Sequence, residues 1–214
     1  MLVNELKGSP FYMLAALSIL VLSLAYQIKA PFLIDVGAPG DARYLDNFHD
    51  RETAEGLDYR WSSERSSAVF PDIGGCSSIL VSLRLNGHRP ADLPDPKVTV
   101  KANGRDIGSF LVTEGFETYE LAVGGFASGV SGSLKLELHS ESFVPHQLNG
   151  GGDRRTLGVI LDHVSARCQG GIGSVVIPAP LPMILATTGV LASYLLMRWF
   201  VRSCLLYTSP SPRD

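Results

Sequence analysis

Five acidic residues lie close together in a turn-rich segment, and they form the densest set of side chains that could hold a metal ion. They are Asp35, Asp41, Asp46, Asp50 and Glu52. Oxygen-rich loops bind Ca²⁺, which takes about 6 to 8 oxygen ligands, so a structural Ca²⁺ ion is one interpretation. The spacing matches no EF-hand, and Asp commonly hydrogen-bonds the backbone of turns, so a solvated loop without metal is the alternative. We expect no other cofactor.

Tyr59, Arg60 and Trp61 could form a binding surface for a sugar. Trp61 is the only tryptophan between the two long apolar runs of the chain, and an exposed aromatic face is a platform on which a pyranose ring can stack. Tyr59 lies two residues away, so on a strand both rings share one face. The alternative is that both rings fill the core, since aromatic side chains on an alternating strand usually point inward. Arg60 would then face outward or pair with an acid of the preceding segment.

Cys76 and Cys168 could form a disulfide. The bridge would close a loop of about 90 residues and stabilise the fold by roughly 4 kcal/mol in the chain-entropy model. We predict this bridge. Two unpaired, buried thiols are the alternative, because the sequence does not show that the two Cα atoms come within roughly 7 Å.

The histidines give no catalytic pattern. All five lie between the apolar runs, and His163 directly follows Asp162. Adjacent strand residues point to opposite faces, so we expect these two not to act as a dyad. The sequence holds no HExxH, CxxC, Walker or GxGxxG arrangement in its required context and no GxSxG. We therefore predict no metal or triad chemistry, and no catalytic residue is nominated from the motifs.

The elements that must position these side chains are strands. Residues 79–86, 97–101 and 134–139 alternate apolar and polar side chains, which is typical of half-buried antiparallel strands, and 157–167 is the last strong strand. Asn103-Gly104 favours a type I′ hairpin. Eight or so strands without an amphipathic helix predict a mainly β fold, an antiparallel two-sheet sandwich over residues 57–168. A lead-in loop over 30–56 should contain at most one short strand, at 32–36.

Two apolar runs flank this domain. No charged residue occurs from 169 through 197, and about 20 helical residues cross the ~30 Å hydrocarbon core. We predict transmembrane helices over 11–28 and 181–201, the second following a linker over 169–180. A cleaved signal peptide is the alternative for the first. Arg198 and Arg202 follow the second run, so the positive-inside rule places both readable termini, residues 1–10 included, in the cytoplasm and the sandwich outside.

The charge of the exterior region excludes one class of partner. Residues 35–167 contain 19 acidic and 13 basic side chains, a net charge of -6. The whole chain is slightly apolar, with a mean hydropathy of +0.17. Nucleic-acid binding needs a basic face, so we predict no nucleic-acid partner. The lipid bilayer is the partner that we expect.

The last eleven residues, CLLYTSPSPRD over 204–214, resemble the translation of a sequencing adapter. We expect this tail to be an artefact that must be excluded from the fold. The readable chain would then be a fragment of a longer protein with further spans. A genuine short cytoplasmic tail is the alternative.

The hairpin KVTVKANGRDIGSFLV and the closing strand LGVILDHVSAR resemble a galactose-binding-like jelly-roll of the carbohydrate-binding-module type. The segments DVGAPGDARYLDNFHDRE and YRWSSERSSAVFPDIG resemble the N-terminal exterior region of uncharacterised bacterial multi-pass membrane proteins, some of them similar to membrane glycosyltransferases that use lipid-linked sugars. The resemblance implies a location in the bacterial plasma membrane. It also nominates Asp35 or Asp41 as a general base.

Three functions remain open at this point. The first is a membrane-anchored exterior module that binds glycan or another envelope component, with Trp61, Tyr59, Arg60, Asp35 and Asp41 as candidate ligand-binding residues. The second is the N-terminal fragment of a glycosyltransferase. The third is a non-catalytic scaffold that contacts membrane protein subunits.

Overall fold

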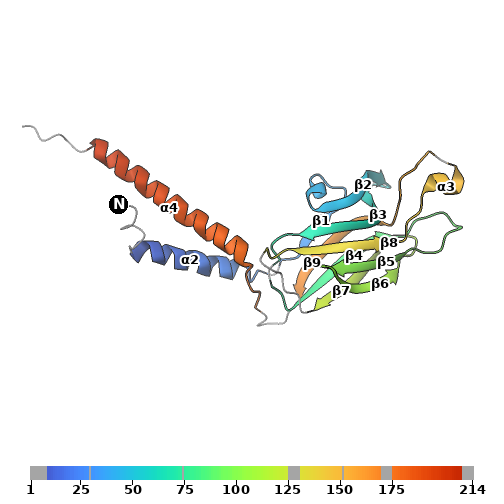
Figure 1. The fold of residues 1–214 in the computed structure, drawn as a ribbon, viewed down its shortest axis with the longest axis horizontal. Coiled ribbons are helices and arrows are strands. Elements are labelled where there is room, and N and C mark those ends of the chain that lie inside the picture. The colour runs from blue at the N-terminus through green and yellow to red at the C-terminus, as the bar shows by residue number, and fades with distance from the viewer. Residues whose placement is uncertain are drawn as a thin grey trace, which may run out of the picture.

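The chain folds into a β-sandwich from one end of which two helices project, as the computed structural model shows (Figure 1). The structure describes residues 9–28, 30–73, 75–124, 131–150, 152–169 and 175–208, with the backbone alone for residues 9, 149 and 202–208. Predictions for residues 1–8 and 209–214, and for the side chain of Arg202, lie outside this part. Helices α2 (Ser9–Ala25) and α4 (Pro180–Thr208) project from one end of the sandwich, and α3 (Pro145–Asn149) lies at the other.

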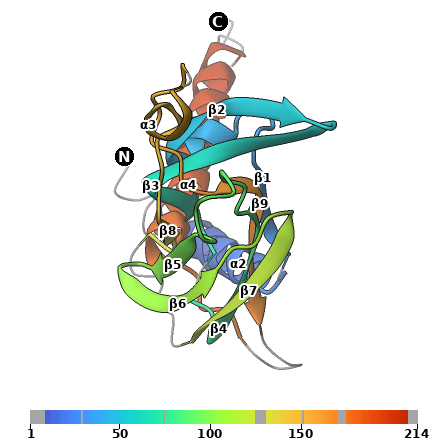
Figure 2. The same cartoon turned by 90° about the vertical axis from the view of Figure 1, so that its right-hand side faces the viewer.

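The strands form one antiparallel sheet that folds over into two layers. One layer has the order β6, β5, β8, β3, β2, and the other has β9, with β1 on its edge, then β4 and β7. The layers join where Arg60 and Trp61 of β3 pair with Leu161 and Ile160 of β9. Figure 2 views this arrangement from the end opposite the helices. The strands are β1 (Phe32–Asp35), β2 (Leu45–Ala54), β3 (Leu57–Phe70), β4 (Ser78–Asn86), β5 (Lys97–Ala102), β6 (Arg105–Leu111), β7 (Glu117–Gly124), β8 (Leu134–Ser140) and β9 (Ile160–Gln169). The prediction of a mainly β, antiparallel fold is confirmed.

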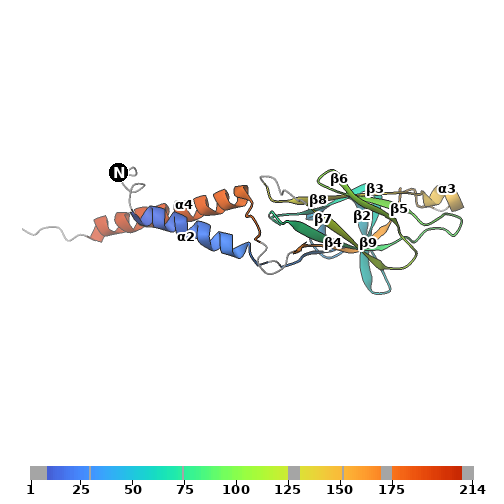
Figure 3. The same ribbon diagram turned by 90° about the horizontal axis from the view of Figure 1, so that it is seen from below.

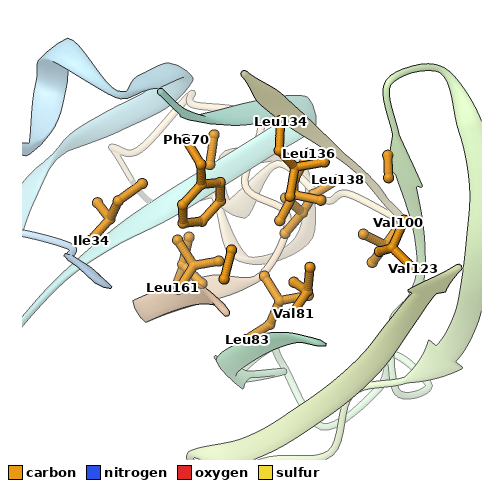
Figure 4. Packing of buried hydrophobic residues seen from close by; sticks show 14 of the residues in the cluster. Ile34, Phe70, Val81, Leu83, Val100, Val123, Leu134, Leu136, Leu138 and Leu161 are labelled. Atoms are coloured by element: carbon orange, nitrogen blue, oxygen red, sulfur yellow. The ribbon is translucent and has the colours of Figure 1, made fainter. Parts of the chain in front are cut away.

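The core lies between the two layers. Alternate residues of β8 point inward and are fully buried, and they face alternate residues of β4 and β9 (Figure 4). The polar residues between them on β8 and β5 remain partly or fully exposed. The period of two in the sequence is therefore the period of burial. The innermost side chains include Phe70, Val81, Leu83, Leu134, Leu136, Leu138 and Leu161.

The predicted hairpin is confirmed. Asn103 and Gly104 have φ angles of 47° and 79°, as a type I′ turn requires, and β5 pairs with β6 on either side of them. The predicted loop over 30–56 is wrong in part. Its short strand is β1, but Leu45–Ala54 forms β2, which pairs with the long strand β3. Register shifts interrupt that pairing, which is why β2 shows no alternation of polar and apolar residues.

One helix, not two, has the length and composition to cross a membrane among the described residues. The α4 segment Pro180–Val201 contains 22 residues with a hydropathy of 1.6, and none of its most apolar stretch is buried. Helix α2 is apolar but shorter, at 17 residues. The two helices lie side by side (Figures 1 and 3). The prediction of two membrane-length helices therefore holds for α4 alone.

The helix-proximal end of the sandwich is cross-linked. Cys76, just before β4, and Cys168 of β9 form a disulfide with a Cα–Cα distance of 5.7 Å. Nearby, Gly75 pairs with Ile177 on the segment that leads into α4. The start of α4 is thus fastened to the same end of the sheet.

Candidate functional site

The aromatic pair proposed for sugar stacking lies in a small cluster beside the main core. Trp61 is 6% exposed and packs with Leu157 and Ile160, and its ring meets Phe143 edge-on at 6.1 Å. Tyr59 packs against the same cluster. Trp61 therefore presents no open face to a sugar ring, and its burial agrees with the core interpretation.

Arg60, which is partly buried, and Asp41, which is buried, form an ion pair. The guanidinium donates to both carboxylate oxygens, at 2.7 and 2.9 Å, and a third hydrogen bond runs from Arg60 to the carbonyl of His49. The amide of Gly37 also donates to Asp41. Burial raises the pKa of Asp41, but the hydrogen bonds from Arg60 and from backbone amides outweigh it, so the net pKa is lowered. Asp41 is thus a structural anion. It is the acid of the preceding segment with which Arg60 pairs, one of the two alternatives given for Arg60.

The remaining acidic residues of the predicted Ca²⁺ cluster are dispersed. Asp35 is exposed on β1, whereas Asp46, Asp50 and Glu52 lie on β2. Glu52 binds Arg155, which also holds Asp153 and lowers the pKa of Asp153 to about 2. Within the described ranges, no group of three or more His, Cys, Asp or Glu side chains could hold a metal ion.

Asp162 and His163 do contact each other, which corrects the sequence argument. Leu161 lies opposite Leu85 and His163 opposite Arg84, so Asp162 is an extra residue in β9. This β-bulge turns its carboxylate toward its neighbours. It accepts from Arg84 at 2.6 Å and lies 3.0 Å from His163 Nδ1. Arg84 and His163 are therefore both engaged by the Asp162 carboxylate.

The outer face of the layer that contains β3, β8 and β5 carries polar side chains that make no such contacts with other described side chains. Arg65 of β3 lies directly opposite His139 of β8, and His139 lies opposite Thr99 of β5. Their side chains form a row across three neighbouring strands. In the part of the chain that the structure describes, no hydrogen bond or ion pair engages the Arg65 guanidinium, the His139 ring or the Thr99 hydroxyl.

A hollow of about 450 Å³ lies over this row. A second hollow of about 230 Å³ adjoins it and shares Arg65 and His139, so the two form one groove along β8. We call it the β8 groove. The first hollow is lined by Glu64, Arg65, Lys97, Thr99, His139, Ser140, Glu141 and Ser142, and the second by Asp46, Asn47, Arg65, Ser66, Ser67, Lys135, Glu137 and His139.

A layer of small buried groups supports the floor of the groove. The Ser140 hydroxyl donates to the carbonyl of Ser63 at 3.1 Å and lies 3.4 Å from the Ser62 hydroxyl. Gly158 passes directly beneath, where a Cβ atom would collide with both hydroxyls. Ser62 and Ser63 lie on β3 between its pairing with β9 and its pairing with β8, so Gly158 packs against the part of β3 that passes from one layer to the other.

Comparisons with known proteins give a likeness of fold only. No family model matches the chain, and no curated protein does. A family GH115 4-O-methyl-alpha-glucuronidase with specificity for decorated arabinogalactans is 16% identical with a TM-score of 0.42, over 66% of this chain and 18% of its own. A family 35 carbohydrate-binding module from Clostridium thermocellum is 12% identical with a TM-score of 0.41, over 64% and 97%.

The ANX2 ectodomain from Arabidopsis thaliana is also similar, at 12% identity and a TM-score of 0.49, over 71% of this chain and 52% of its own. This chain thus spans less than a fifth of the glucuronidase and about half of the ectodomain. At these values the similarity carries no information about what this chain binds.

The sequence nominated none of the residues in the row. Its alternation did separate Thr99 and His139 from the core positions around them, and the structure confirms that separation. The alternation could not show that β5, β8 and β3 are neighbours, because strand order depends on long-range pairing. No pattern in the sequence indicated a role for Arg65.

Proposed function

We propose that this protein is a membrane-anchored β-sandwich module that binds glycan in the β8 groove, outside the cytoplasm. The observation that carries the proposal is the row of Arg65, His139 and Thr99, which lies in an open groove and whose side chains make no hydrogen bond or ion pair with the described residues. Side chains that are already paired, such as Arg84 with Asp162, must give up a partner before they bind a ligand. The side chains of Arg65, His139 and Thr99 have no such partner to give up among the described residues.

The groove offers what a sugar requires. Hydroxyl groups both donate and accept hydrogen bonds, and the first hollow supplies cationic donors and the carboxylates of Glu64 and Glu141 within one surface. Among the described residues, no Phe, Tyr or Trp lines either hollow. Binding would therefore depend on hydrogen bonds and charge rather than on ring stacking. A carboxylated sugar fits best, because a guanidinium binds a carboxylate through two parallel hydrogen bonds.

The anchoring part of the proposal is supported by α4. Its apolar segment Pro180–Val201 is long enough for the bilayer, and Arg198 and Trp199 lie in the last turn of that segment. The C-terminal end of α4 points away from the sandwich (Figure 1). Positive residues favour the cytoplasmic side, so the sandwich would lie outside. The disulfide between Cys76 and Cys168 is compatible with an oxidising compartment.

The test is glycan binding by the full chain in detergent or nanodiscs, first on an array and then by calorimetry. We expect Arg65→Ala to weaken binding by about 10-fold to 100-fold, the loss of a charged hydrogen bond. Arg167→Ala is the matched control, because Arg167 is an exposed strand residue of the other layer. Absence of any glycan ligand, or equal losses in the two variants, would refute the proposal.

A further inference from the structure

A cavity of about 330 Å³ lies where the helices meet the sandwich. Its walls come from the end of α2 and the residues after it, from the turn after β3, and from the end of β9 with the segment before α4. Most of the lining is apolar, including Leu22, Ile28, Phe32, Ile73 and Val176. The cavity is remote from the β8 groove and shares no residue with it.

Specific contacts hold these walls in place. The Gln27 side-chain amide donates to the carbonyl of Val176 at 3.0 Å, and its oxygen accepts from the amide of Val176 at 3.1 Å. This pair of hydrogen bonds ties the end of α2 to the segment before α4. The disulfide between Cys76 and Cys168 fixes the opposite wall, to which Cys168 belongs. The cavity is therefore part of the folded structure.

Among the described residues, the lining of the cavity combines an apolar wall with one carboxylate. Asp72 is exposed and is the only charged residue among those that line the cavity in the described part of the chain. Ile28, on the α2 side, is 77% exposed, and Leu24 on α2 itself is 60% exposed. Apolar residues at the end of α2 and the Asp72 carboxylate thus line the same cavity.

We propose that this cavity binds a membrane phospholipid whose headgroup carries a primary ammonium group. The proposal rests on the membrane anchoring proposed above, which places the ends of α2 and α4 where acyl chains meet headgroups. The apolar wall takes the upper part of an acyl chain, and the Asp72 carboxylate accepts hydrogen bonds from the ammonium group. An ethanolamine headgroup supplies such N–H donors. A choline headgroup has the charge without the donors, and a glycerol headgroup has no positive charge.

The experiment uses the full chain in nanodiscs of equal parts ethanolamine, choline and glycerol phospholipid, with retained lipid identified by native mass spectrometry. We expect about tenfold enrichment of the ethanolamine lipid over the glycerol lipid, the effect of one charged hydrogen bond. Asp72→Asn should abolish the enrichment, and Asn tolerates the φ of 53° at this position. Asp92→Asn, in an exposed loop after β4, is its control.

A second pair of variants tests the cavity itself. Ala30→Trp places a large ring at an exposed lining position and should reduce retained lipid to background. Leu33→Trp, at a β1 position 58% exposed that does not line the cavity, should leave retention unchanged. Equal retention in the two variants would overturn the proposal, as would enrichment that persists in Asp72→Asn, recovery of a free fatty acid in place of phospholipid, or occupation by a second copy of the chain.

Alkaline carbonate washing of membranes separates the two proposals. A chain that the wash releases is not anchored, and this result would overturn both the anchoring and the lipid site. A chain that stays in the membrane but shows no preference for the ethanolamine lipid would overturn the lipid site alone. Glycan binding in the same samples reports on the β8 groove independently.

Discussion

The carboxylate of Asp41 and the guanidinium of Arg60 lie 2.7 Å apart at their closest atoms and are almost hidden from solvent. The Asp41 side chain is 2% exposed and that of Arg60 is 16% exposed. The pair fastens the turn at Asp41–Arg43 to the long strand β3, close to the point where the two layers join. A charge in such a place is tolerable only while its partner is present.

Asp41→Asn should lower the free energy of unfolding by about 3 kcal/mol, because it leaves the Arg60 charge buried without its counter-ion. Chemical unfolding of the full chain in detergent, followed by near-UV circular dichroism, measures this loss. Arg167→Ala, at an exposed position, is the control and should change stability little.

The same pair predicts a dependence on pH. The folded pKa of Asp41 lies below its ordinary value of 3.8, so its contribution is complete above that value and is lost as the pH falls through the folded pKa. Stability should therefore fall on acidification below about pH 4. Asp41→Asn should show a shallower fall, and an identical slope in both proteins would contradict this account.

Trp61→Ala should destabilise the sandwich by about 3 to 5 kcal/mol, as expected for removal of a buried tryptophan. Trp61→Phe should remain folded and bind glycan as the wild type does, since the ring does not line the β8 groove. Calorimetry of glycan binding by the folded Trp61→Phe variant decides whether Trp61 is a core residue or a platform for the sugar. Loss of binding in that variant would restore Trp61 as a sugar platform.

Cys76 and Cys168 should be unreactive in intact cells until a reductant is added. Thiol labelling in a Cys204→Ser background, before and after reduction, counts only these two sulfurs. Reduction should cost roughly 4 kcal/mol of stability for a loop of about 90 residues in the chain-entropy model. Reaction of both cysteines without reductant would exclude the bridge.

Gly158→Ala should perturb the floor of the β8 groove. The added methyl group would meet the hydroxyls of Ser140 and Ser62 and the carbonyl of Ser63, so relief requires a shift of β3 or β8 at these residues. We expect a loss of about 1 to 3 kcal/mol in stability together with weaker glycan binding. Gly152→Ala is the control, because a methyl group there meets open space. Normal stability and binding in Gly158→Ala would show that the floor yields easily.

Reporter fusions test the orientation. A fusion at Gly150, at the end of the sandwich remote from the helices, should report an exterior location, and one after Arg202 should report the cytoplasm. The reverse pair of signals would overturn the orientation. Two signals from the same side would show that α4 does not cross the membrane.

The sequence predicts the inward residues of β4, β5 and β8 because burial imposes a period of two on them. It predicts the hairpin at Asn103 because positive φ angles restrict which residues can stand there. It does not predict β2, whose register shifts break the alternation. The correct predictions concern features that depend on residues close together in the sequence.

The contacts of Asp162 and Arg65 depend on distant parts of the chain. A rule for regular strands separates Asp162 from His163, and only the pairing of β9 with β4 shows the extra residue that brings them together. Likewise, Arg65 becomes part of a row only because β3 lies beside β8. The candidate site is therefore less predictable than the core.

The last strand of the sandwich, β9, lies between β3 and β4 and also receives β1 on its edge. Synthesis begins at the N-terminus, so every other strand emerges before the one that connects the two layers. Until residues 160–169 arrive, β1, one edge of β4, and Arg60 and Trp61 of β3 lack their β9 partners, and open strand edges are the surfaces on which chains aggregate. We therefore expect the yield of folded protein to depend on how soon β9 pairs after it is synthesised.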